Sequence, residues 1–511
     1  MSNSGKFYAI NPSNNEQLEG EFVNATESQI DEAVNIAQQA FDIYRKKDKD
    51  SVADFLNCIA DEIVNLGDAL IERANLETAL PLARLQGERG RTVGQLKLFA
   101  SLVREGSWVD ARIDTAIPDR VPLPKSDIRH MLLPLGPVAI FGASNFPLAF
   151  SVAGGDTVSA LAAGCPVVVK AHPAHPGTSA MVGQAIQKAV IKCGMPEGVF
   201  SLIQGNNNEV GTLLVLHKAI KAVGFTGSFN GGKALFDLAN TRPEPIPVFA
   251  EMGSTNPVFI LPGILKEKAE TIAAGLAGSI TMGVGQFCTN PGLTFITKSD
   301  SANQFIAELS SKINEFPAST MLTAGINTAF DKKIKSTLEI DAVEEIATGK
   351  SVDSVNSAKA RIFKTAIASF SKNKALAEEN FGPSSVIVEA DTKEQILDAA
   401  RNLEGHLTAT IHGTDGDFAE YKELFDILEL KVGRILINGY PTGVEVCHSM
   451  VHGGPYPATT APQSTSVGTG AIKRFVRPVC FQDYPDAILP IALRRGNPLH
   501  IWRLVNGNLE K

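Results

Sequence analysis

The sequence predicts an α/β protein with more than one parallel sheet. Between residues 132 and 260, short apolar runs rich in β-branched residues end in loop signals and are followed by helix-like stretches, as in "GPVAIFGASNFP" and "CPVVVKAHPAHPG". This alternation is typical of parallel strands covered by helices on both faces. The pattern starts again over about 250–470, with "NPVFIL", "GLTFIT", "SSVIVEA" and "GRILING". Because 511 residues exceed the size of one typical core, we expect two or three domains.

The N-terminal part is predicted to be helical. In "ATESQIDEAVNIAQQAF", Thr26 and Gln29 form a capping-box pattern, and apolar residues recur at helical spacing from Ile30 to Phe41. Further helical patterns cover about 50–80, 85–105 and 178–193.

Composition and charge argue against several classes of protein. The formal net charge is −8 and no dense basic run occurs, so neither nucleic acid nor an anionic membrane is expected as a main partner. The N-terminus lacks the basic flank and apolar segment of a secretory signal, and no stretch of about 20 apolar residues occurs. We therefore expect a cytoplasmic protein.

Cysteine and histidine spacing predicts no metal site. The six cysteines have no CxxC spacing, which indicates neither a disulfide framework nor a zinc site. The nine histidines form no HExxH pattern, and Pro173 lies between His172 and His175, so no helix aligns that pair.

Several polar residues and glycines follow the predicted strands. Ser144 and Asn145 come after "VAIF", Lys170 follows "VVV", and Gly227 and Ser228 follow "VGF". Ligands gather at the carboxyl ends of parallel strands, and a helix N-terminus holds phosphate well, so together these residues favour a nucleotide site. Each has an ordinary alternative: a solvated lysine at the strand end, and a tight turn with close helix packing at Gly227 and Gly232.

Cys288, in "GQFCTNPG", is the candidate nucleophile. It lies among glycines and an Asn-Pro turn, outside any apolar periodicity, which is the setting of an ordinary loop or of a presented thiol. Glu251, in "PVFAEMGSTNP", follows an apolar run and faces the same crevice if it ends a strand; otherwise it is a surface carboxylate. Glu379, in "EENFGPSSV", is either a second site carboxylate or an ordinary helix-end residue.

A family resemblance joins these residues. "GASNFP", "VVVKAHPAHPG", "FTGSFNGG", "EMGSTNP", "GQFCTNPG" and "ENFGP" resemble, in order and approximate spacing, the motifs of the aldehyde dehydrogenase superfamily over roughly residues 5–480. The segment from "FGASNFP" to "HPGTS" is most similar to the branch of 2-oxoglutarate semialdehyde (2,5-dioxovalerate) dehydrogenases and NADP-dependent fatty aldehyde dehydrogenases. The implied fold is a Rossmann-like cofactor domain, an α/β catalytic domain and a small oligomerisation arm.

The resemblance also implies a role for each of the three candidate catalytic residues. Cys288 is expected to attack the aldehyde carbonyl, giving a thiohemiacetal and then, after hydride transfer, a thioester. Asn145 and the Cys288 backbone N–H are expected to form the oxyanion hole, and Glu251 to act as general base for hydrolysis. The cofactor is expected to be NADP or NAD, with no metal.

The remaining expected cofactor contacts come from short motifs. The resemblance assigns Lys170 and Glu379 to the riboses and the glycine turn to the pyrophosphate. The full set of expected cofactor-binding residues is Ser144, Lys170, Pro173, Gly227, Ser228, Gly232, Glu379 and Phe381.

Departures from the family pattern bear on cofactor choice. Pro173 stands where NAD-preferring members commonly carry a glutamate, which removes repulsion against a 2′-phosphate and favours NADP, with dual use remaining open. Ser144 replaces the usual tryptophan, and "EMGS" replaces "ELGG"; neither change removes a catalytic group.

Substrate choice depends on the segment "GERGRTVGQLKLF". In a helix, Arg91 and Gln95 share a face and are placed to hold a distal carboxylate, or else that face is simply solvated. Phe146 and Phe287 are expected to line the inner tunnel. The favoured substrate is 2-oxoglutarate semialdehyde; the alternatives are a medium- or long-chain aliphatic aldehyde or, in another class, a cysteine hydrolase or acyltransferase with a histidine base.

The predicted domains are discontinuous. Residues 113–130 and 471–511 fit neither core pattern and are expected to form arms in a homo-oligomer, either a dimer or a tetramer. The cofactor-binding domain is predicted to comprise residues 1–112 and 131–249, and the catalytic domain residues 250–470.

Overall fold

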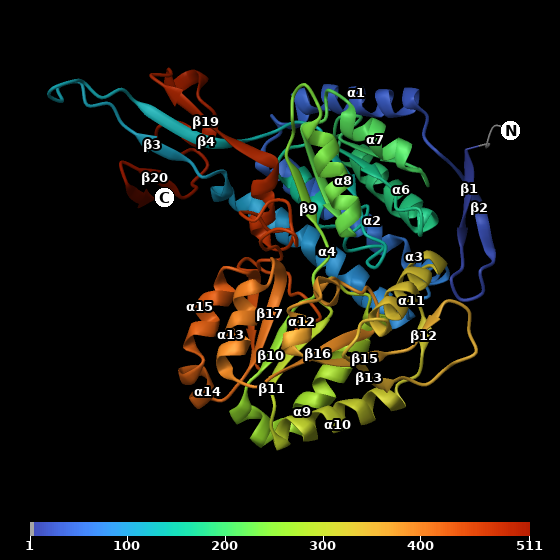
Figure 1. The fold of residues 1–511 in the computed structure, drawn as a ribbon. Helices are drawn as coiled ribbons and strands as arrows, with labels where there is room; N and C mark the ends of the chain where they lie inside the picture. Colours follow the sequence, from blue (N-terminus) through green and yellow to red (C-terminus); the bar gives the residue numbers. More distant parts are fainter. Residues whose placement is uncertain (1–4) are drawn as a thin grey trace.

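Two parallel sheets form the cores of two lobes in the computed structural model, which describes residues 5–511 (Figure 1). The first lobe holds a five-stranded sheet in the order β7-β6-β5-β8-β9, with every neighbouring pair parallel. The chain runs outward from β5 to β7, then returns to the other side of β5 for β8. The switch point therefore lies between β5 and β8, where the carboxyl ends of the strands leave a crevice for a ligand.

The strands of this sheet are short. They are β5 (Val138–Phe141), β6 (Val167–Lys170), β7 (Phe200–Ile203), β8 (Ala222–Thr226) and β9 (Val248–Glu251). The helices around them are α1 (Glu27–Tyr44), α2 (Lys49–Asn65), α3 (Gly67–Thr78), α4 (Leu82–Glu105), α5 (Gly155–Ala162), α6 (Pro176–Lys192), α7 (Asn208–Leu216) and α8 (Phe229–Asn240).

Successive residues of the central strands point to opposite helical layers. In β5, Val138 and Ile140 pack in one apolar cluster, while Ala139 and Phe141 pack in another on the opposite face. Every residue of β5 is buried, because helices cover both faces. The sequence shows this as an unbroken apolar run rather than an alternation. The capping box predicted at Thr26 is confirmed, and α1 extends to Tyr44.

The second lobe has a seven-stranded sheet in the order β13-β15-β16-β11-β10-β17-β18. Only the edge strand β13 runs antiparallel to its neighbour. The strands are β10 (Val258–Ile260), β11 (Leu293–Thr297), β13 (Val343–Thr348), β15 (Arg361–Ala366), β16 (Ser384–Ala390), β17 (His406–His412) and β18 (Val432–Ile437). Their helices are α9 (Pro262–Thr281), α10 (Asp300–Glu315), α11 (Ala324–Leu338), α12 (Ile367–Phe370), α13 (Lys393–Asn402), α14 (Asp415–Glu420) and α15 (Lys422–Glu429).

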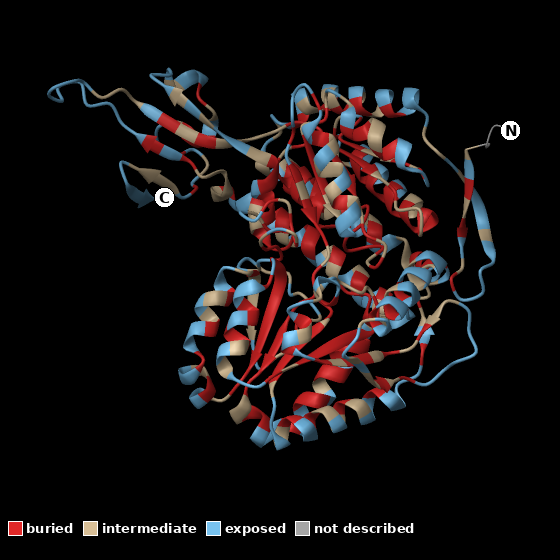
Figure 2. Cartoon of the chain, viewed as in Figure 1, coloured by how far each residue is buried: buried red, intermediate tan, exposed pale blue. Residues whose placement is uncertain are grey.

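A third sheet projects from the first lobe as an arm (Figure 1). Its order is β19-β4-β3-β20-β21, and it has a small apolar cluster of its own. The strands are β3 (Arg112–Asp114), β4 (Ile128–Pro134), β19 (Val476–Gln482), β20 (Arg503–Val505) and β21 (Asn508–Glu510). Figure 2 shows that the two lobe sheets are largely buried, whereas much of the arm is exposed.

The observed elements differ in detail from the predicted segment limits. β4 belongs to the arm sheet and continues to Pro134, beyond the predicted segment 113–130. The predicted boundary between residues 249 and 250 falls inside β9, because apolar residues continue to the end of that strand at Glu251. Residues 1–4 of the predicted cofactor domain lie outside the described part. The division into functional domains stays a prediction.

The remaining elements are the β1–β2 hairpin, the antiparallel pair β12–β14 and short helical turns. They are β1 (Lys6–Ile10), β2 (Gln17–Val23), β12 (Ser319–Thr320), β14 (Ser357–Ala358), η1 (Ser107–Val109), η2 (Met282–Gly285), η3 (Lys374–Ala377), η4 (Thr469–Phe475), η5 (Asp486–Ile488) and η6 (Ile491–Leu493). Across residues 5–511, none of the helices combines the length and the apolarity needed to cross a membrane.

Candidate active site

The Cys288 loop follows η2 and is bent by three consecutive residues in the left-handed region. Gly283, Val284 and Gly285 have φ angles of 55°, 59° and 63°. At position 285 a Cβ would lie 2.3 Å from the backbone of Gly382, so only glycine fits there. The turn carries Cys288 away from the end of α9 and leaves it partly exposed.

The buried side chain of Asn256 holds the Cys288 loop in place through hydrogen bonds. The Asn256 side-chain amide donates to the carbonyl oxygens of Cys288 and Asn290, each at 2.9 Å. Its Oδ1 accepts from the hydroxyls of Ser254 and Thr408, the latter in β17. The loop is thereby tied to the central strands of the second sheet. No hydrogen bond from the Cys288 backbone N–H occurs within residues 5–511, which leaves that donor available.

Glu251 lies beside Cys288 and is held by two donors. Nε2–H of His452 donates to Oε1 at 2.8 Å, and the Ser466 hydroxyl donates to Oε2 at 2.5 Å. The Cys288 sulfur lies 3.4 Å from the same His452 Nε2. Glu251 is the last residue of β9 and is only 3% exposed, so the expectation that it ends a strand facing the crevice is confirmed.

The environment assigns opposite protonation states to the thiol and the carboxyl. Burial and the negative charge of Glu251 raise the pKa of Cys288 well above its ordinary value. Burial alone would also raise the pKa of Glu251, but the charge of His452 and hydrogen bonds from His452, Ser466 and Cys288 outweigh it, and its pKa is lowered. Near neutral pH the pair is therefore a thiol beside a carboxylate.

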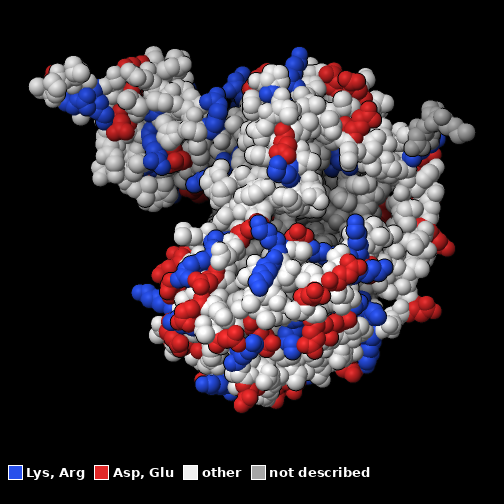
Figure 3. Space-filling model, in the orientation of Figure 1, with Lys and Arg blue, Asp and Glu red and all other residues white. Residues whose placement is uncertain are grey.

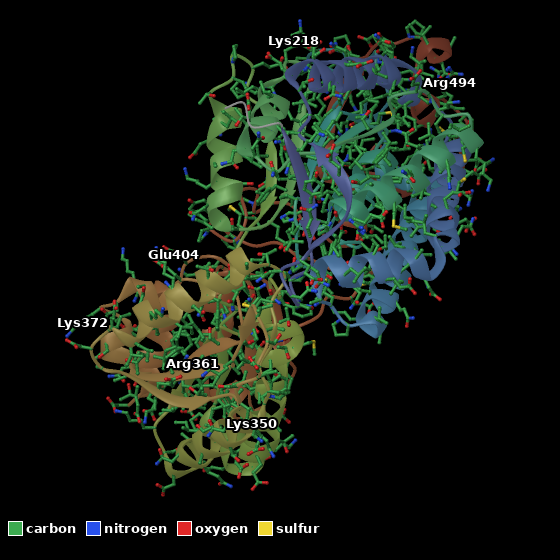
Figure 4. The ribbon with its side chains drawn as sticks, turned by 90° about the vertical axis from the view of Figure 1, so that its right-hand side faces the viewer. Lys218, Lys350, Arg361, Lys372, Glu404 and Arg494 are labelled. Atoms are coloured by element: carbon green, nitrogen blue, oxygen red, sulfur yellow. The ribbon has the colours of Figure 1, made fainter. Side chains whose placement is uncertain are left out.

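Asn145 reaches the Cys288 loop from the other lobe. Its side-chain amide donates to the carbonyl oxygen of Gln286 at 2.9 Å, two residues before the cysteine. Arg84 in turn donates through Nη2 to the Asn145 carbonyl at 2.7 Å. The structure thus brings Asn145, Cys288 and Glu251 together across the boundary between the lobes, where the space-filling view is hollowed (Figure 3). Figure 4 shows the two lobes from the side, with Lys218 on one and Arg361 on the other.

Aromatic rings and arginines pack together beside the Cys288 loop. Phe146 and Phe287 meet edge to face with ring centroids 5.4 Å apart. The guanidinium of Arg84 lies over both rings, at 5.0 and 4.9 Å from their centroids. Arg91 lies over Phe150 at 5.0 Å and over Phe146 at 5.8 Å. This wall combines apolar faces with two positive charges, the arrangement of a cation–π contact.

Arg91 and Gln95 share one face of α4, as expected for a helix. They line a cavity of about 570 Å³ that also contacts the 444–446 loop. The Gln95 side chain is buried, and its Nε2 has no hydrogen-bond partner among residues 5–511. Burial lowers the pKa of Arg91, while the nearby charges of Cys288 and Glu88 act in the opposite direction. Arg91 and Gln95 therefore do not lie on a fully solvated face of the helix, which was the alternative interpretation of the sequence.

The strand-end residues meet at the switch point of the first sheet. Lys170 ends β6, and burial, the sole cause, lowers the pKa of its ammonium to about 8. Ser228 is the N-cap of α8 and accepts from the Gly231 N–H at 3.2 Å. A half-buried cation with no anionic neighbour among the described residues and a capped helix N-terminus fit the phosphate and ribose groups of a dinucleotide.

The glycines of this turn have a packing role as well. A Cβ at Gly232 would lie 2.7 Å from both Cγ and Sδ of Met252, and one at Gly227 would lie 2.7 Å from the Phe225 ring. Close packing of α8 on the sheet accounts for both positions, so the structure supports the alternative noted for them without excluding a contact to phosphate.

Glu379 faces the opposite side of the same crevice. A Cβ at Gly253 would lie 2.1 Å from its Oε2, so the glycine permits the carboxyl to approach the end of β9. Burial raises the pKa of Glu379 to about 7, against a smaller opposing effect of a backbone hydrogen bond from Ser254. Phe381 lies two residues further along the same loop. Pro173 and Ser144 lie in the loops that follow β6 and β5.

His452 and Arg84 are the site residues that sequence reasoning missed. His452 lies in an irregular segment after β18, 201 residues from Glu251, and no motif marks it. Arg84 lies in the first turn of α4 and has no distinguishing neighbour in the sequence. The only available signal was the setting of His452 before Gly-Gly, which indicates a tight backbone. The prediction of no metal site stays a prediction; the side chains of Glu251, Cys288 and His452 offer donor atoms within 4.8 Å of one another.

Comparison with known proteins identifies the family. The aldehyde dehydrogenase family matches residues 1–456. The chain belongs to the aldehyde dehydrogenase family. Two curated relatives of this aldehyde dehydrogenase match nearly its full length. It is 51% identical, over 99% of its own length and 97% of the relative's, to alpha-ketoglutaric semialdehyde dehydrogenase 2 of Azospirillum brasilense. It is 48% identical, over 96% of its length and 93% of the relative's, to alpha-ketoglutaric semialdehyde dehydrogenase of Acinetobacter baylyi.

Solved structures confirm the fold of this aldehyde dehydrogenase. Betaine aldehyde dehydrogenase of Staphylococcus aureus, in complex with NAD⁺, superposes with a TM-score of 0.80 at 19% identity and covers 95% of this chain and 93% of its own. Glyceraldehyde-3-phosphate dehydrogenase of Methanocaldococcus jannaschii, complexed with NADP, has a TM-score of 0.79 at 20% identity and covers 94% of this chain and 99% of its own. The predicted α/β fold with parallel sheets is therefore confirmed, and the protein is an oxidoreductase that acts on aldehydes.

Proposed function

We propose that this aldehyde dehydrogenase oxidises 2-oxoglutarate semialdehyde to 2-oxoglutarate with NADP or NAD as the hydride acceptor. The observation that carries the proposal is the arginine on the cavity face of α4. Arg91 is largely buried, yet its Nε and Nη2 are without hydrogen-bond partners among the described residues. An unpaired guanidinium in such a place is costly unless a ligand supplies the acceptor.

The distal carboxylate of the substrate is the acceptor that fits. A carboxylate accepts two parallel hydrogen bonds from a guanidinium, and the Phe146 and Phe150 rings already hold Arg91 in place from one side. Gln95 offers a further N–H from the next turn of the helix. The two relatives described above act on alpha-ketoglutaric semialdehyde by name, which supports the same substrate here.

The reaction begins with the partly exposed Cys288 thiol. As the Cys288 sulfur attacks the aldehyde carbonyl, its proton passes to Glu251, which releases it to solvent before hydrolysis begins, and the carbonyl oxygen becomes an oxyanion. Asn145 and the free Cys288 N–H are the donors for that oxyanion; losing one such donor costs about 3–4 kcal/mol. Lys170, Ser228 and Glu379 would hold a nicotinamide dinucleotide, and when bound it would accept the hydride that the Cys288 thiohemiacetal must lose to become a thioester.

Hydrolysis then releases the product. Glu251 takes a proton from water, the resulting hydroxide attacks the thioester carbonyl, and the C–S bond breaks to return the Cys288 thiolate. The lowered pKa of Glu251 keeps it ionised for this step. The net change consumes one aldehyde, one water and one oxidised cofactor, and yields one carboxylate, one reduced cofactor and two protons.

The hydrolase alternative is less well supported by the position of His452. In a cysteine–histidine catalytic pair, one ring nitrogen faces the sulfur and the other is oriented by a third group. Here Nε2 faces both Cys288 and Glu251, while the buried Nδ1 has no partner among residues 5–511. The imidazole therefore positions the carboxylate rather than relaying a proton along a triad.

We also propose that the protein prefers NADP while retaining use of NAD. Lys170 offers a positive charge at the end of β6, and Pro173 brings no carboxylate against a 2′-phosphate. A kcat/KM that is higher with NAD than with NADP would overturn this preference.

A substrate comparison with a matched variant tests the main proposal. We expect a higher kcat/KM for 2-oxoglutarate semialdehyde than for hexanal, and about a 10- to 100-fold loss for the acidic aldehyde alone in Arg91→Gln. Lys97→Gln is the control, because Lys97 lines the outer end of the same cavity but is exposed. A preference for hexanal, or equal losses in both variants, would refute the assignment. Cys288→Ala should abolish oxidation of either aldehyde.

We propose that the protein is a homo-oligomer, a dimer or a tetramer, in the cytoplasm, and exposed apolar residues on the arm support the assembly. Val121 and Leu123, between β3 and β4, are 87% and 69% exposed, an unusual position for large apolar side chains. Measurement of the molar mass in solution for wild type and for Val121→Lys/Leu123→Lys tests the proposal. A wild-type protein that is monomeric would contradict it.

A further inference from the structure

Three side chains at the reaction centre form a cluster of potential metal ligands. The donor atoms of Glu251, Cys288 and His452 all lie within 4.8 Å of one another. The sulfur is 3.4 Å from His452 Nε2, and that nitrogen is 2.8 Å from Glu251 Oε1. Bond lengths of 2.0–2.3 Å in tetrahedral zinc sites place neighbouring donors about 3.3–3.7 Å apart. The sulfur–nitrogen pair already has this spacing, and the oxygen–nitrogen pair must widen by about half an ångström.

The donor types select a soft or borderline cation. One thiolate, one imidazole and one carboxylate make a common set for Zn²⁺, and Cd²⁺ binds thiolate still more readily, whereas Mg²⁺ and Ca²⁺ require oxygen ligands. When the thiol proton is released to water, the sulfur and the carboxylate carry two negative charges, which offset those of the cation. The positive charge of Arg91, which acts on Cys288, opposes binding and limits its affinity.

The hydrogen-bond partners of the three potential ligands are not those of a permanently bound metal ion. Histidines that hold structural or catalytic zinc normally donate their second N–H to a carbonyl or carboxylate. His452 Nδ1 is buried and has no such partner among the described residues. Only Glu251 has outer support, from the Ser466 hydroxyl at 2.5 Å. Cys288 is partly exposed, so a cation can reach the cluster from the sulfur side.

We propose that Glu251, Cys288 and His452 form an inhibitory site for a thiophilic divalent cation, Zn²⁺ or Cd²⁺. An ion bound there ties up the nucleophile and the general base together, and a chelator reverses the block. The binding follows from the three donors alone. The inhibition rests on the proposed function, because it requires Cys288 and Glu251 to carry the oxidation.

Cadmium binding to the metal-free enzyme tests the site without any turnover. We expect one Cd²⁺ per chain, an ultraviolet thiolate-to-cadmium absorption, and a Kd measurable by calorimetry in the absence of aldehyde and cofactor. Cys288→Ser should lose the absorption. His452→Phe and His452→Gln should each raise the Kd at least about tenfold. Circular dichroism shows whether the variants fold.

The adjacent pair Cys447 and His448 provides the matched control. These neighbours in the sequence also offer a thiol and an imidazole, and Cys447 is partly exposed like Cys288, but within residues 5–511 they belong to no cluster of three potential ligands. Cys447→Ser and His448→Phe should leave the absorption and the Kd unchanged. An absorption that persists in Cys288→Ser, or a Kd that changes as much in His448→Phe as in His452→Phe, would overturn the proposal.

Inhibition is then measured separately. Zn²⁺ should suppress aldehyde oxidation by the wild-type enzyme, and excess EDTA should restore it. Oxidation that is absent even with EDTA, while Cd²⁺ still binds through Cys288, refutes the proposed function and leaves the metal site standing. Oxidation that is present but insensitive to Zn²⁺ refutes the inhibitory site alone.

Discussion

Glu251 and Glu379 are two carboxyl groups in one crevice with opposite pKa shifts. Glu251 is held by the imidazole of His452 and the hydroxyl of Ser466, and its pKa is lowered despite nearly complete burial. Among residues 5–511, the hydrogen bond to Glu379 comes from the backbone of Ser254, and burial raises the pKa of Glu379 to about 7. Burial acts in the same direction on both, so the hydrogen-bond donors decide which one stays ionised. Glu251 therefore stays ionised and available as a base, whereas Glu379 titrates near neutral pH.

The largest expected effect is a difference in kinetics between variants that lack one of the two carboxylates. Glu251→Gln should lower kcat by about 10²- to 10⁴-fold, because the thioester then lacks its general base. Glu379→Gln should act mainly on the KM for the cofactor, since the amide still fits beside Gly253. Steady-state kinetics with varied aldehyde and varied cofactor distinguish the two effects. Equal losses of kcat in both variants would show that the two carboxyls do not have separate roles.

Removing the imidazole that donates to Glu251 should bring the pKa of Glu251 closer to that of Glu379. In His452→Phe the stabilising charge and hydrogen bond are lost, so the pKa of Glu251 should rise and the acid limb of the kcat/KM profile should move to higher pH. We expect about a tenfold loss of kcat/KM at neutral pH. The comparison variant is His448→Phe, which should retain the wild-type profile. An acid limb that stays in place would show that His452 does not control the base.

The smallest expected effect is a pH dependence of cofactor affinity. Glu379 has a pKa of about 7, so its carboxyl is mostly protonated below that pH and ionised above it. A carboxylate accepts hydrogen bonds from ribose hydroxyls more strongly than the acid does, so cofactor affinity should increase as pH rises through 7. Fluorescence titration with NADP between pH 6 and 8 measures it. Glu379→Gln should remove the dependence; an increase in affinity that survives in this variant must come from another group, because loss of the Lys170 charge on raising the pH would act in the opposite direction.

The same carboxyl has a second consequence, for stability. Because the folded-state pKa of Glu379 is raised, the folded protein holds this proton more tightly than the unfolded chain does between about pH 4.5 and 7. The free energy of unfolding contributed by this group therefore falls as pH rises through that window. Glu379→Gln should reduce the decline, as thermal unfolding at pH 5 and pH 7 can measure.

Much of the site could be predicted from local sequence because many of its polar residues stand at or directly after the ends of strands. Lys170, Glu251 and the Gly227–Ser228 turn each come directly after an apolar run, and parallel pairing brings those ends to one edge. The bent setting of Cys288 was likewise visible as glycines and an Asn-Pro turn. Each of these signals is local in the sequence, and the folding of the parallel sheet brings the residues that carry them close together in space.

His452 could not be predicted in this way. It belongs to the long irregular segment between β18 and η4, where no periodicity indicates which side chain points inward. Its contact with Glu251 depends on how that segment folds back across the crevice. Arg84 was missed for a different reason: a single arginine in an amphipathic helix usually lies in solvent, and only the positions of Phe146 and Phe287 show that it is stacked.

The asparagines that hold the catalytic loop have a consequence for the chemical lifetime of the protein. Asn256 bridges the Cys288 and Asn290 carbonyls, and Asn290 donates to the Gly382 carbonyl. Deamidation at Asn256 would replace its N–H donors with an anion facing those carbonyl oxygens. The usual route requires the next residue's backbone N–H to close a succinimide ring. Both asparagines precede proline, which has no N–H, so the side chains that position the nucleophile are also protected from this form of ageing.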